Sequence, residues 1–279
     1  MSIIGFVGFG VVGQATAKGF GTKHTVLFHD KYKASSPLEK VVAESEFLFL
    51  CLPTPMTRDY SGIDLTILEE AVHQIAPLLA GTGKILVVKS TVVPGTTARF
   101  AKAYPKVHFA MNPEFLREKT AEWDFMNPDR IILGSNDKTV AQRFEDLYRS
   151  ILPEPPIHHT NTTSAEIVKY MANTYLAMKV IFANEWAEMC RRLGVDYGEV
   201  KEMVVSDKRI CDSHLDVTPE RGFGGKCFPK DIVALLGLAE EMNVDLSLLK
   251  QTWEKNLEIR KDRDWEQIDG AVSKQRALS

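Results

Sequence analysis

The sequence predicts an α/β protein in which a mostly parallel sheet is followed by an all-helical domain with one long helix. Two observations predict this class. Short apolar segments alternate with amphipathic segments through the first half of the chain, which is typical of βαβ units. After a Pro-rich linker at residues 152–156, nearly every segment has helical periodicity. We therefore expect two domains, at residues 1–160 and 161–279.

Strands and helices of the first half can be placed from these patterns. Apolar runs of strand length lie near residues 3–7, 25–29, 46–51, 84–88, 107–110 and 130–134. Helical segments lie between them near residues 11–20, 64–79 and 137–150. The strongest apolar run, at residues 47–52, is far shorter than the roughly 18 residues that span a bilayer. We therefore expect no transmembrane helix and no membrane partner.

One long helix dominates the second half. Ser164 is a suitable N-cap, apolar residues recur at helical spacing to about Leu193, and Gly194 is a natural stop. The recurring residues are Ile167, Val168, Met171, Tyr175, Met178 and Phe182. A helix this long is typical either of a dimer seam or of an intramolecular backbone helix. Shorter helices are expected over residues 229–242 and 246–260, and the polar last fifteen residues are expected to be frayed.

The composition is that of an ordinary globular protein. The chain has 279 residues, of which 44% are hydrophobic and 25% charged, and its formal net charge is -3. This balance argues against a dedicated nucleic-acid binder and against a polybasic membrane anchor. The first residues read as a strand and not as a signal peptide, and the four cysteines lie far apart, which fits a reducing cytosol. We therefore expect a cytoplasmic protein.

A glycine-rich turn, GFGVVG at residues 8–13, follows the first strand and opens the first helix. Its glycines permit a tight turn, close approach of a pyrophosphate, and packing of the helix on the strand, while the helix N-terminus attracts phosphate. An acidic residue ends the next strand, where a carboxylate accepts hydrogen bonds from ribose hydroxyls and repels a 2′-phosphate. This Rossmann-type pattern predicts NAD rather than NADP; the alternative is a glycine turn that binds nothing. The predicted contacts are Gly8, Gly10, Val11, Val12, Gly13 and Asp30.

A second constellation is GFGGKCFPKD at residues 222–231. The glycines could form a loop that wraps a phosphate or a sugar with backbone N–H groups. Pro229 suits the first turn of the following helix, so Cys227 is expected at the helix N-terminus between two lysines, a setting that favours a thiolate nucleophile. The alternative is a buried structural cysteine.

Two further groups are ambiguous from the residues alone. Lys169 and Asn173 lie at i and i+4 on the long helix, so they could hold a developing oxyanion together or form a solvated surface pair. Glu114 and Glu118 lie in a segment after a strand that reads as a polar turn. We expect no metal site, since the few His and Cys residues lack partners at ligand spacing.

In this order, the motifs resemble the UDP-glucose/GDP-mannose dehydrogenase family. The matching segments are GFVGFGVVG, LPTP (52–55), KSTVVPGTT (89–97), NPEFLRE (112–118), PDRIILG (128–134), AEIVKYMANTYLAMKVIFANE (165–185), DKRI (207–210) and GFGGKCFPKD (222–231). The resemblance implies two successive oxidations at C6 of a sugar nucleotide, with two NAD, as in the conversion of UDP-glucose to UDP-glucuronate. Residues 1–160 would bind NAD, and residues 161–279 would carry the cysteine loop, bind substrate and form a homodimer through the helix near 164–193. We expect a short form that lacks the family's C-terminal nucleotide-binding domain.

The resemblance also implies roles for the residues that match the motifs. Cys227 would attack the intermediate aldehyde, giving a thiohemiacetal and then a thioester that water hydrolyses. Lys169 and Asn173 would stabilise the oxyanion, and Asp231 would assist the cysteine and the water. The implied water and cofactor contacts beside the nicotinamide are Thr54, Thr91 and Glu118, with Glu114 in support. The implied substrate contacts are Glu114, Phe115, Leu116, Arg117, Lys169, Asn173, Phe223, Gly224, Gly225 and, from the neighbouring subunit, Arg209.

Two other functions remain open at this level. A two-electron β-hydroxyacid dehydrogenase shares the predicted domain plan but needs no cysteine. A catalytically silent subunit could bind nucleotide sugars or serve in assembly. Cys227 in its glycine loop favours the four-electron oxidation over the first alternative. The presence of every residue needed for the chemistry argues against the second.

Overall fold

The computed structural model describes residues 1–274, which divide into two compact units. The sheet unit comprises residues 1–54 and 64–169, and the helical unit comprises residues 55–63 and the described residues from Tyr170 onward. This division differs from the predicted boundary at residue 160 in two places. The first turns of the long helix belong to the sheet unit, and a short segment from the first half of the chain belongs to the helical unit.

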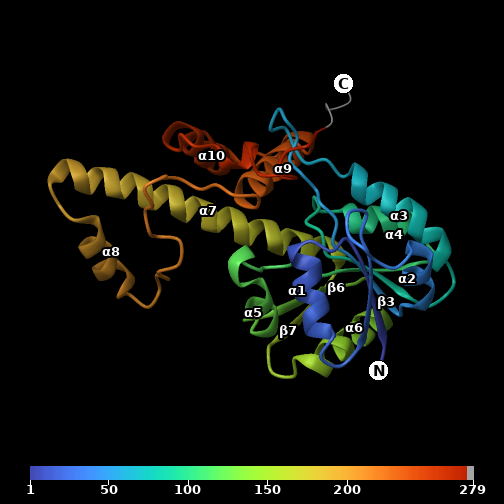
Figure 1. Cartoon of the computed structure of the whole chain (residues 1–279). Coiled ribbons are helices and arrows are strands. Elements are labelled where there is room, and N and C mark those ends of the chain that lie inside the picture. Colours follow the sequence, from blue (N-terminus) through green and yellow to red (C-terminus); the bar gives the residue numbers. More distant parts are fainter. Residues whose placement is uncertain (275–279) are drawn as a thin grey trace. The chain divides into compact units, whose positions relative to one another are not determined.

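The sheet unit contains one seven-stranded sheet in the order β2-β1-β3-β4-β5-β6-β7. Figure 1 labels β3, β6 and β7 of this sheet. All neighbouring strands are parallel except β5 and β6, so the predicted mostly parallel sheet is confirmed. The strands are β1 (Ile3–Val7), β2 (Thr25–His29), β3 (Phe47–Leu50), β4 (Ile85–Val88), β5 (His108–Met111), β6 (Ile131–Gly134) and β7 (Ile157–Thr160).

Helices cover both faces of this sheet because the buried strands are apolar on both sides. Leu48 and Leu50 of β3 pack in the core beneath α2 (Leu38–Glu44), α3 (Thr66–Leu79) and α4 (Thr96–Ala103). Phe47 and Phe49, which alternate with them, pack in the core beneath α1 (Val11–Phe20), α5 (Ala121–Met126) and α6 (Lys138–Ile151). The sequence did not predict α2, α4 and α5, which are too short to show a clear apolar period.

The long helix α7 (Thr162–Leu193) begins before the predicted cap at Ser164. The side chain of Asn161 accepts a hydrogen bond from the Ser164 amide at 2.8 Å, and Gly194, with φ of 69°, ends the helix. Glu166 is fully buried and accepts hydrogen bonds from the amides of Gly95 (2.6 Å) and Thr97 (2.8 Å) at the start of α4. Burial raises the pKa of Glu166, although these hydrogen bonds oppose the shift. The contacts with α4 attach the first turns of α7 to the sheet unit.

The helical unit packs α8 (Tyr197–Val205), α9 (Phe228–Glu241), α10 (Ser247–Ile259) and the 3-10 helix η2 (Asp264–Glu266) with the rest of α7. Its core includes Trp253 and Trp265, whose ring centroids lie 5.7 Å apart. Trp265 is fully buried, and the backbone of Met56 forms hydrogen bonds with Ala271 and Ser273 at 2.9 Å and 2.7 Å. The prediction that the last fifteen residues are frayed is therefore wrong for 265–274, because one tryptophan anchors a polar segment; residues 275–279 lie outside the described part.

The segment Pro55–Ile63 belongs to the helical unit through close backbone packing. Gly237 of α9 lies against the carbonyl of Ser61, so that a Cβ atom at Gly237 would be 2.0 Å from the Ser61 oxygen. The phenol oxygen of Tyr60 lies 3.3 Å from the indole nitrogen of Trp265, which donates to it. These contacts join the segment to α9 and to the aromatic core.

We expect Gly237→Ala to destabilise the protein by about 1–3 kcal/mol, although alanine favours a helix by about 1 kcal/mol. The added methyl group must displace the backbone at Ser61, which is not a flexible side-chain end. Urea denaturation measures the loss. Gly62→Ala is the matched control, since its Cβ atom would meet nothing within 4 Å. Equal stability of the two variants would contradict this packing argument.

Candidate active site

The glycine-rich turn after β1 has the geometry of a dinucleotide-binding turn. Gly8 has φ of 88°, and a Cβ atom there would lie 2.5 Å from the Cys51 carbonyl. At Gly13 a Cβ atom would lie 2.5 Å from the Gly8 carbonyl, whereas at Gly10 it would meet nothing within 4 Å. Packing therefore requires glycine at the first and third positions. The open space beside Gly10, at the N-terminus of α1, fits the close approach of a pyrophosphate.

Asp30 fastens the end of β2 to this turn. Its Oδ2 atom accepts a hydrogen bond from the Phe9 amide at 2.7 Å, and its Oδ1 atom accepts one from the Tyr32 amide at 2.9 Å. The ammonium of Lys33 also donates to the Phe9 carbonyl at 2.6 Å. Asp30 thus orders the turn in addition to its predicted part in ribose recognition.

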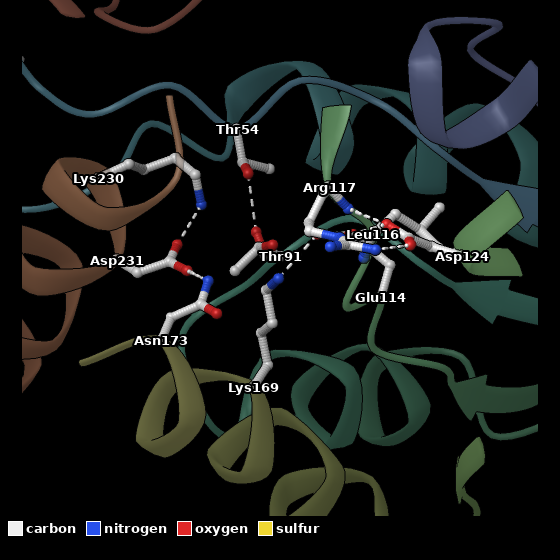
Figure 2. Close-up of polar contacts among 10 residues, drawn as sticks. All are labelled: Thr54, Thr91, Glu114, Leu116, Arg117, Asp124, Lys169, Asn173, Lys230 and Asp231. Atoms are coloured by element: carbon white, nitrogen blue, oxygen red, sulfur yellow. Dashed lines mark hydrogen bonds and ion pairs between the residues drawn. The ribbon is translucent and has the colours of Figure 1, made fainter. Parts of the chain in front are cut away.

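Two other predicted cofactor contacts lie in loops after β3 and β4. The Thr54 hydroxyl donates to the carbonyl of Thr91 at 2.7 Å, which ties the two loops together (Figure 2). Glu118 opens the 3-10 helix η1 (Glu118–Thr120), and with the first turns of α1 this segment lines a hollow of about 500 Å³. The residues that line it are Val11, Gln14, Ala15, Glu118, Lys119, Thr120, Ala121, Glu122 and Trp123. The sheet unit therefore brings Glu118 and Val11 to one hollow.

A buried ion pair joins the segment after β5 to α7. The Lys169 ammonium donates to Glu114 Oε1 at 2.8 Å, and the two side chains are 5% and 10% exposed (Figure 2). The other carboxylate oxygen of Glu114 accepts from the Leu116 amide at 2.8 Å. Burial alone would raise the pKa of Glu114, but the Lys169 charge and these hydrogen bonds outweigh burial and leave the pKa below its ordinary value. Lys169 is thus not part of a solvated surface pair.

A buried network that the sequence did not reveal anchors the same segment. The ammonium of Lys89 and the hydroxyl of Tyr148 both donate to Asn112 Oδ1, at 2.7 Å and 2.5 Å. Asn112 in turn donates to the Ile132 carbonyl at 2.9 Å. Burial is the main cause that lowers the pKa of Lys89 to about 8. The partners are far apart in sequence and only the sheet topology brings them together, so no local motif could have identified the network.

The remaining predicted substrate contacts of the sheet unit have different environments. Phe115 is half-buried, with the guanidinium of Arg130 at 4.3 Å and the ammonium of Lys169 at 5.6 Å from its ring centroid. Leu116 is half-buried as well. Arg117 is exposed and forms an ion pair with Asp124 at 2.6 Å. The Phe115 ring therefore lies beside Lys169, which is the predicted oxyanion-binding lysine. The Arg117 guanidinium is already paired with Asp124.

In the helical unit, a buried carboxylate joins α7 to α9. Asp231 is fully buried, accepts from the Asn173 amide group at 2.6 Å and pairs with the Lys230 ammonium at 2.5 Å (Figure 2). The Asp231 backbone amide donates to the carbonyl of Cys227 at 2.9 Å. Cys227 is exposed and caps the N-terminus of α9, one turn before Asp231. Asp231 is therefore hydrogen-bonded both to Cys227, the predicted nucleophile, and to Asn173, a predicted oxyanion donor.

The glycine loop before Cys227 is held by protein groups. The amides of Gly222, Phe223 and Gly225 donate to Asn184, Asn256 and Asp264, at 3.3, 2.8 and 3.0 Å respectively. The N–H groups of Gly222 and Gly225, two of the three glycines expected to wrap a phosphate or a sugar, are thus occupied by side chains of the protein.

Phe223 and Arg209 are the two remaining predicted substrate contacts of the helical unit. The Phe223 ring is 4% exposed and packs on Trp253, so it is a core side chain. Arg209 is exposed and pairs with Asp207 at 2.6 Å.

Disulfides, metal-binding clusters and membrane-spanning helices are absent from the part of the chain that the structure describes. None of the four cysteines, all of which lie in the described part, forms a disulfide. No three His, Cys, Asp or Glu side chains among residues 1–274 gather as metal ligands. Over the same residues, no helix combines the length and the hydropathy that crossing a membrane requires.

Family models match both units. Residues 22–152 match the NAD-binding domain of the UDP-glucose/GDP-mannose dehydrogenase family, and residues 163–258 match its central domain. A UDP-glucose 6-dehydrogenase of Haloferax volcanii is 35% identical over 242 residues, which cover 81% of this chain and 55% of that protein. The chain spans about half the length of the curated relatives it matches.

Comparison with solved structures agrees with the match to the family models. A UDP-glucose dehydrogenase from Pyrobaculum islandicum matches with a TM-score of 0.84 and 32% identity, over 92% of this chain and 68% of that one. A 3-hydroxyisobutyrate dehydrogenase of Mycobacterium tuberculosis matches with a TM-score of 0.76 over 94% of this chain and 95% of that one, but at 14% identity. The second likeness shows the fold alone.

We expect Lys169→Met to lower the free energy of unfolding by about 3–5 kcal/mol at pH 7, because it leaves a buried carboxylate without its main cation. Without that cation, burial becomes the main influence on Glu114 and raises its pKa, so the ionised form becomes destabilising. The loss should therefore be larger at pH 7 than at pH 5, where a raised pKa leaves more of the carboxyl protonated. Urea denaturation at both pH values measures it.

The control is Glu114→Gln in the Lys169→Met background, which removes the buried charge. We expect it to recover at least half of the lost stability at pH 7. A loss of the same size at both pH values, with no recovery in the double variant, would refute the ion-pair argument.

Proposed function

The chain belongs to the UDP-glucose/GDP-mannose dehydrogenase family, and on that premise we propose that it is an NAD-dependent oxidoreductase acting on a sugar nucleotide. We propose that it oxidises the C6 alcohol to a carboxylate, with UDP-glucose as the expected substrate. The observation that carries this proposal is Cys227, exposed at the N-terminus of α9 and one turn from the buried Asp231.

The turn at residues 8–13 fits a dinucleotide, since the space beside Gly10 is open and Asp30 lies at the end of β2. NAD, when bound, accepts a hydride in each of the two oxidations. In the first, C6 loses a hydride and its hydroxyl loses a proton, which gives an aldehyde. We assign Thr91 and Glu118 to hold the water that takes this proton, with Glu114 in support. Asp30 would repel a 2′-phosphate, which favours NAD over NADP.

The second oxidation assigns a covalent role to Cys227. Its thiolate adds to the aldehyde carbon, and the carbonyl oxygen becomes the oxyanion of a thiohemiacetal. The Lys169 ammonium and the Asn173 amide group are proposed to stabilise that charge. Loss of the second hydride gives a thioester, and water then cleaves the C–S bond, releasing the carboxylate and the thiol. Asp231 is proposed to assist the cysteine and to accept a proton from the water.

The two alternatives account for less of the site. The likeness to a 3-hydroxyisobutyrate dehydrogenase concerns the fold, and a two-electron oxidation leaves the exposed Cys227 and the buried Asp231 without a chemical role. A silent binding subunit would not need to keep Lys169 and Glu114 as a buried ion pair, which costs desolvation. Both arguments favour the four-electron reaction.

We further propose a homodimer through α7. This helix exposes large apolar side chains that recur along one stripe, which a protein surface rarely leaves uncovered. The stripe comprises Ile167, Met171, Tyr175, Phe182, Trp186, Met189 and Leu193. A second copy of the same helix would present the same stripe, as a two-fold interface requires. In the dimer, Arg209 would break its ion pair with Asp207 and contact the sugar that is bound by the neighbouring subunit.

If Cys227 carries the thioester, each sugar oxidised by the wild-type protein should yield two NADH and one carboxylate. Cys227→Ala is expected to abolish acid formation while the dissociation constant of NAD changes less than about threefold. NADH absorbance and chromatography of the products measure both. Cys211→Ala, which removes another exposed cysteine, is the matched control and should retain activity. Undiminished acid production by Cys227→Ala would rule the mechanism out.

The dimer should have twice the 31.3 kDa mass of the chain in light scattering. Phe182→Lys places a charge in the stripe and is expected to shift the protein to monomer, because an unpaired charge would be buried in the interface. Leu248→Lys makes the same change at an exposed apolar position on α10 and should leave the dimer intact. A monomeric wild-type protein, or a dimer that tolerates Phe182→Lys, would contradict the proposal.

A further inference from the structure

Three side chains of the helical unit hold the glycine loop 222–225 from one side, and we refer to Asn256, Arg260 and Asp264 as the loop latch. Asn256 makes two hydrogen bonds with Phe223, accepting from its amide at 2.8 Å and donating to its carbonyl at 3.1 Å. Asp264 accepts from the Gly225 amide at 3.0 Å. Arg260 donates to the Arg221 carbonyl at 3.1 Å. The latch residues are spaced by four and come from the end of α10 and the start of η2.

Close approach to the latch explains why the loop contains glycine. A Cβ atom at Gly224 would lie 2.2 Å from Asp264 Oδ1 and 2.5 Å from an Arg260 guanidinium nitrogen. At Gly222 it would lie 2.3 Å from Asn256 Oδ1. These atoms belong to side chains and not to the backbone, so a methyl group at either position would have to displace the latch; at Gly222 the φ of 57° favours glycine as well.

The latch is charged, and two of its three side chains are buried, whereas Asp264 is 32% exposed. Asn256 is fully buried and Arg260 is 8% exposed, and the guanidinium of Arg260 pairs with Asp264 at 3.2 Å. Arg260 also donates from Nη1 to the Arg221 carbonyl, whereas its Nε atom is buried without a hydrogen-bond partner. A partly buried ion pair adds little net stability, so its main effect is on the geometry of the groups that it joins. Side chains of the protein therefore hold the loop through the amides of Phe223 and Gly225 and the carbonyl of Arg221.

Among the loop residues that the latch holds, Gly225 is the nearest to Cys227 in sequence, and its partner is Asp264. Gly225 stands two residues before Cys227 and has φ of 74°. Glycine adopts this backbone conformation as readily as several others, so a single hydrogen bond can select it. Cys227 in turn caps α9, where the helix field favours an anion only within the first turn. Releasing Gly225 therefore lets Cys227 leave the position in which the helix stabilises its thiolate.

We propose that Asp264 is a positioning residue for Cys227. By accepting the Gly225 N–H and pairing with Arg260, it selects the loop conformation that places the thiol at the N-terminus of α9. The consequence for turnover rests on the proposed function, in which Cys227 is the nucleophile. The consequence for thiol reactivity does not, and can be measured in the absence of substrate and cofactor.

The test compares the alkylation of Cys227 by iodoacetamide in the wild-type protein and in Asp264→Ala. Peptide mass spectrometry follows Cys227, and the exposed Cys211 of the same molecule serves as internal reference. We expect the Cys227 rate to fall about fivefold relative to the Cys211 rate, the factor that corresponds to one lost hydrogen bond. Asp262→Ala, which removes an exposed carboxylate two residues away, should leave the ratio unchanged.

Asp264→Asn separates the hydrogen bond from the charge, because its amide oxygen can still accept from Gly225. We expect it to recover at least half of the lost rate. In an active enzyme, Asp264→Ala should lower kcat by a similar factor while the KM for NAD stays within about twofold. A merely structural defect would not spare the cofactor in this way.

Hydrogen exchange of the wild-type protein tests the proposal without any variant. The amide of Gly225 is expected to exchange at least about tenfold more slowly than the amide of the exposed Lys226. Fast exchange at Gly225, or a wild-type Cys227 rate in folded Asp264→Ala, would overturn the proposal. Absence of dehydrogenase activity in the wild-type protein would instead refute the proposed function. The expected exchange rate at Gly225 and the expected alkylation rates at Cys227 would not depend on that result.

Discussion

The candidate site depends on one constraint: its charged side chains are buried, and each must be paired or hydrogen-bonded if the folded state is to remain stable. Lys89, Glu114 and Lys169 in the sheet unit are each at least nine-tenths buried, and Asp231 in the helical unit is fully buried. An ionised group in such surroundings is tolerated only when it is paired or hydrogen-bonded. Each of these groups has a partner from a different element, and Asp231 also pairs with its neighbour Lys230 in α9. The need to satisfy buried charge therefore determines where the loops after β4 and β5 and the helices α7 and α9 lie within their units.

This constraint also explains the rigidity of the loops that carry the proposed chemistry. A polar group stabilises a transition state most when it is oriented beforehand, since no free energy is then spent on reorganising it. The Glu114 carboxylate orients Lys169, and Asp231 orients Asn173. The glycine loop follows the same principle, because side chains of the chain itself occupy its N–H groups. Loops that are ordered in this way are suited to covalent chemistry at a single thiol.

Local sequence patterns predicted the parts of the structure that are local in origin. Six of the seven strands, the extent of α7 and the place of Cys227 at a helix N-terminus follow from apolar period, Gly194 and Pro229, whereas β7 was not predicted. The short helices α2, α4, α5 and α8 were missed because fewer than three turns leave no clear period. The order of residues 265–274 was missed because it depends on the burial of Trp265 against distant partners. The Lys89 network and the loop latch were missed for the same reason, since neither has a local motif.

The likeness to a 3-hydroxyisobutyrate dehydrogenase shows why the fold alone cannot decide the reaction. That structure matches this chain over 94% of its length at 14% identity, so a parallel sheet followed by a long helix is compatible with very different residues. Function has to be argued from the site grafted on the fold. A second oxidation of an aldehyde needs a nucleophile that can carry an acyl group, and a single oxidation of an alcohol does not. The exposed Cys227 at a helix N-terminus is the residue that we propose for the first need, and the latch, through Asp264 and Gly225, is what we propose to hold it in that position.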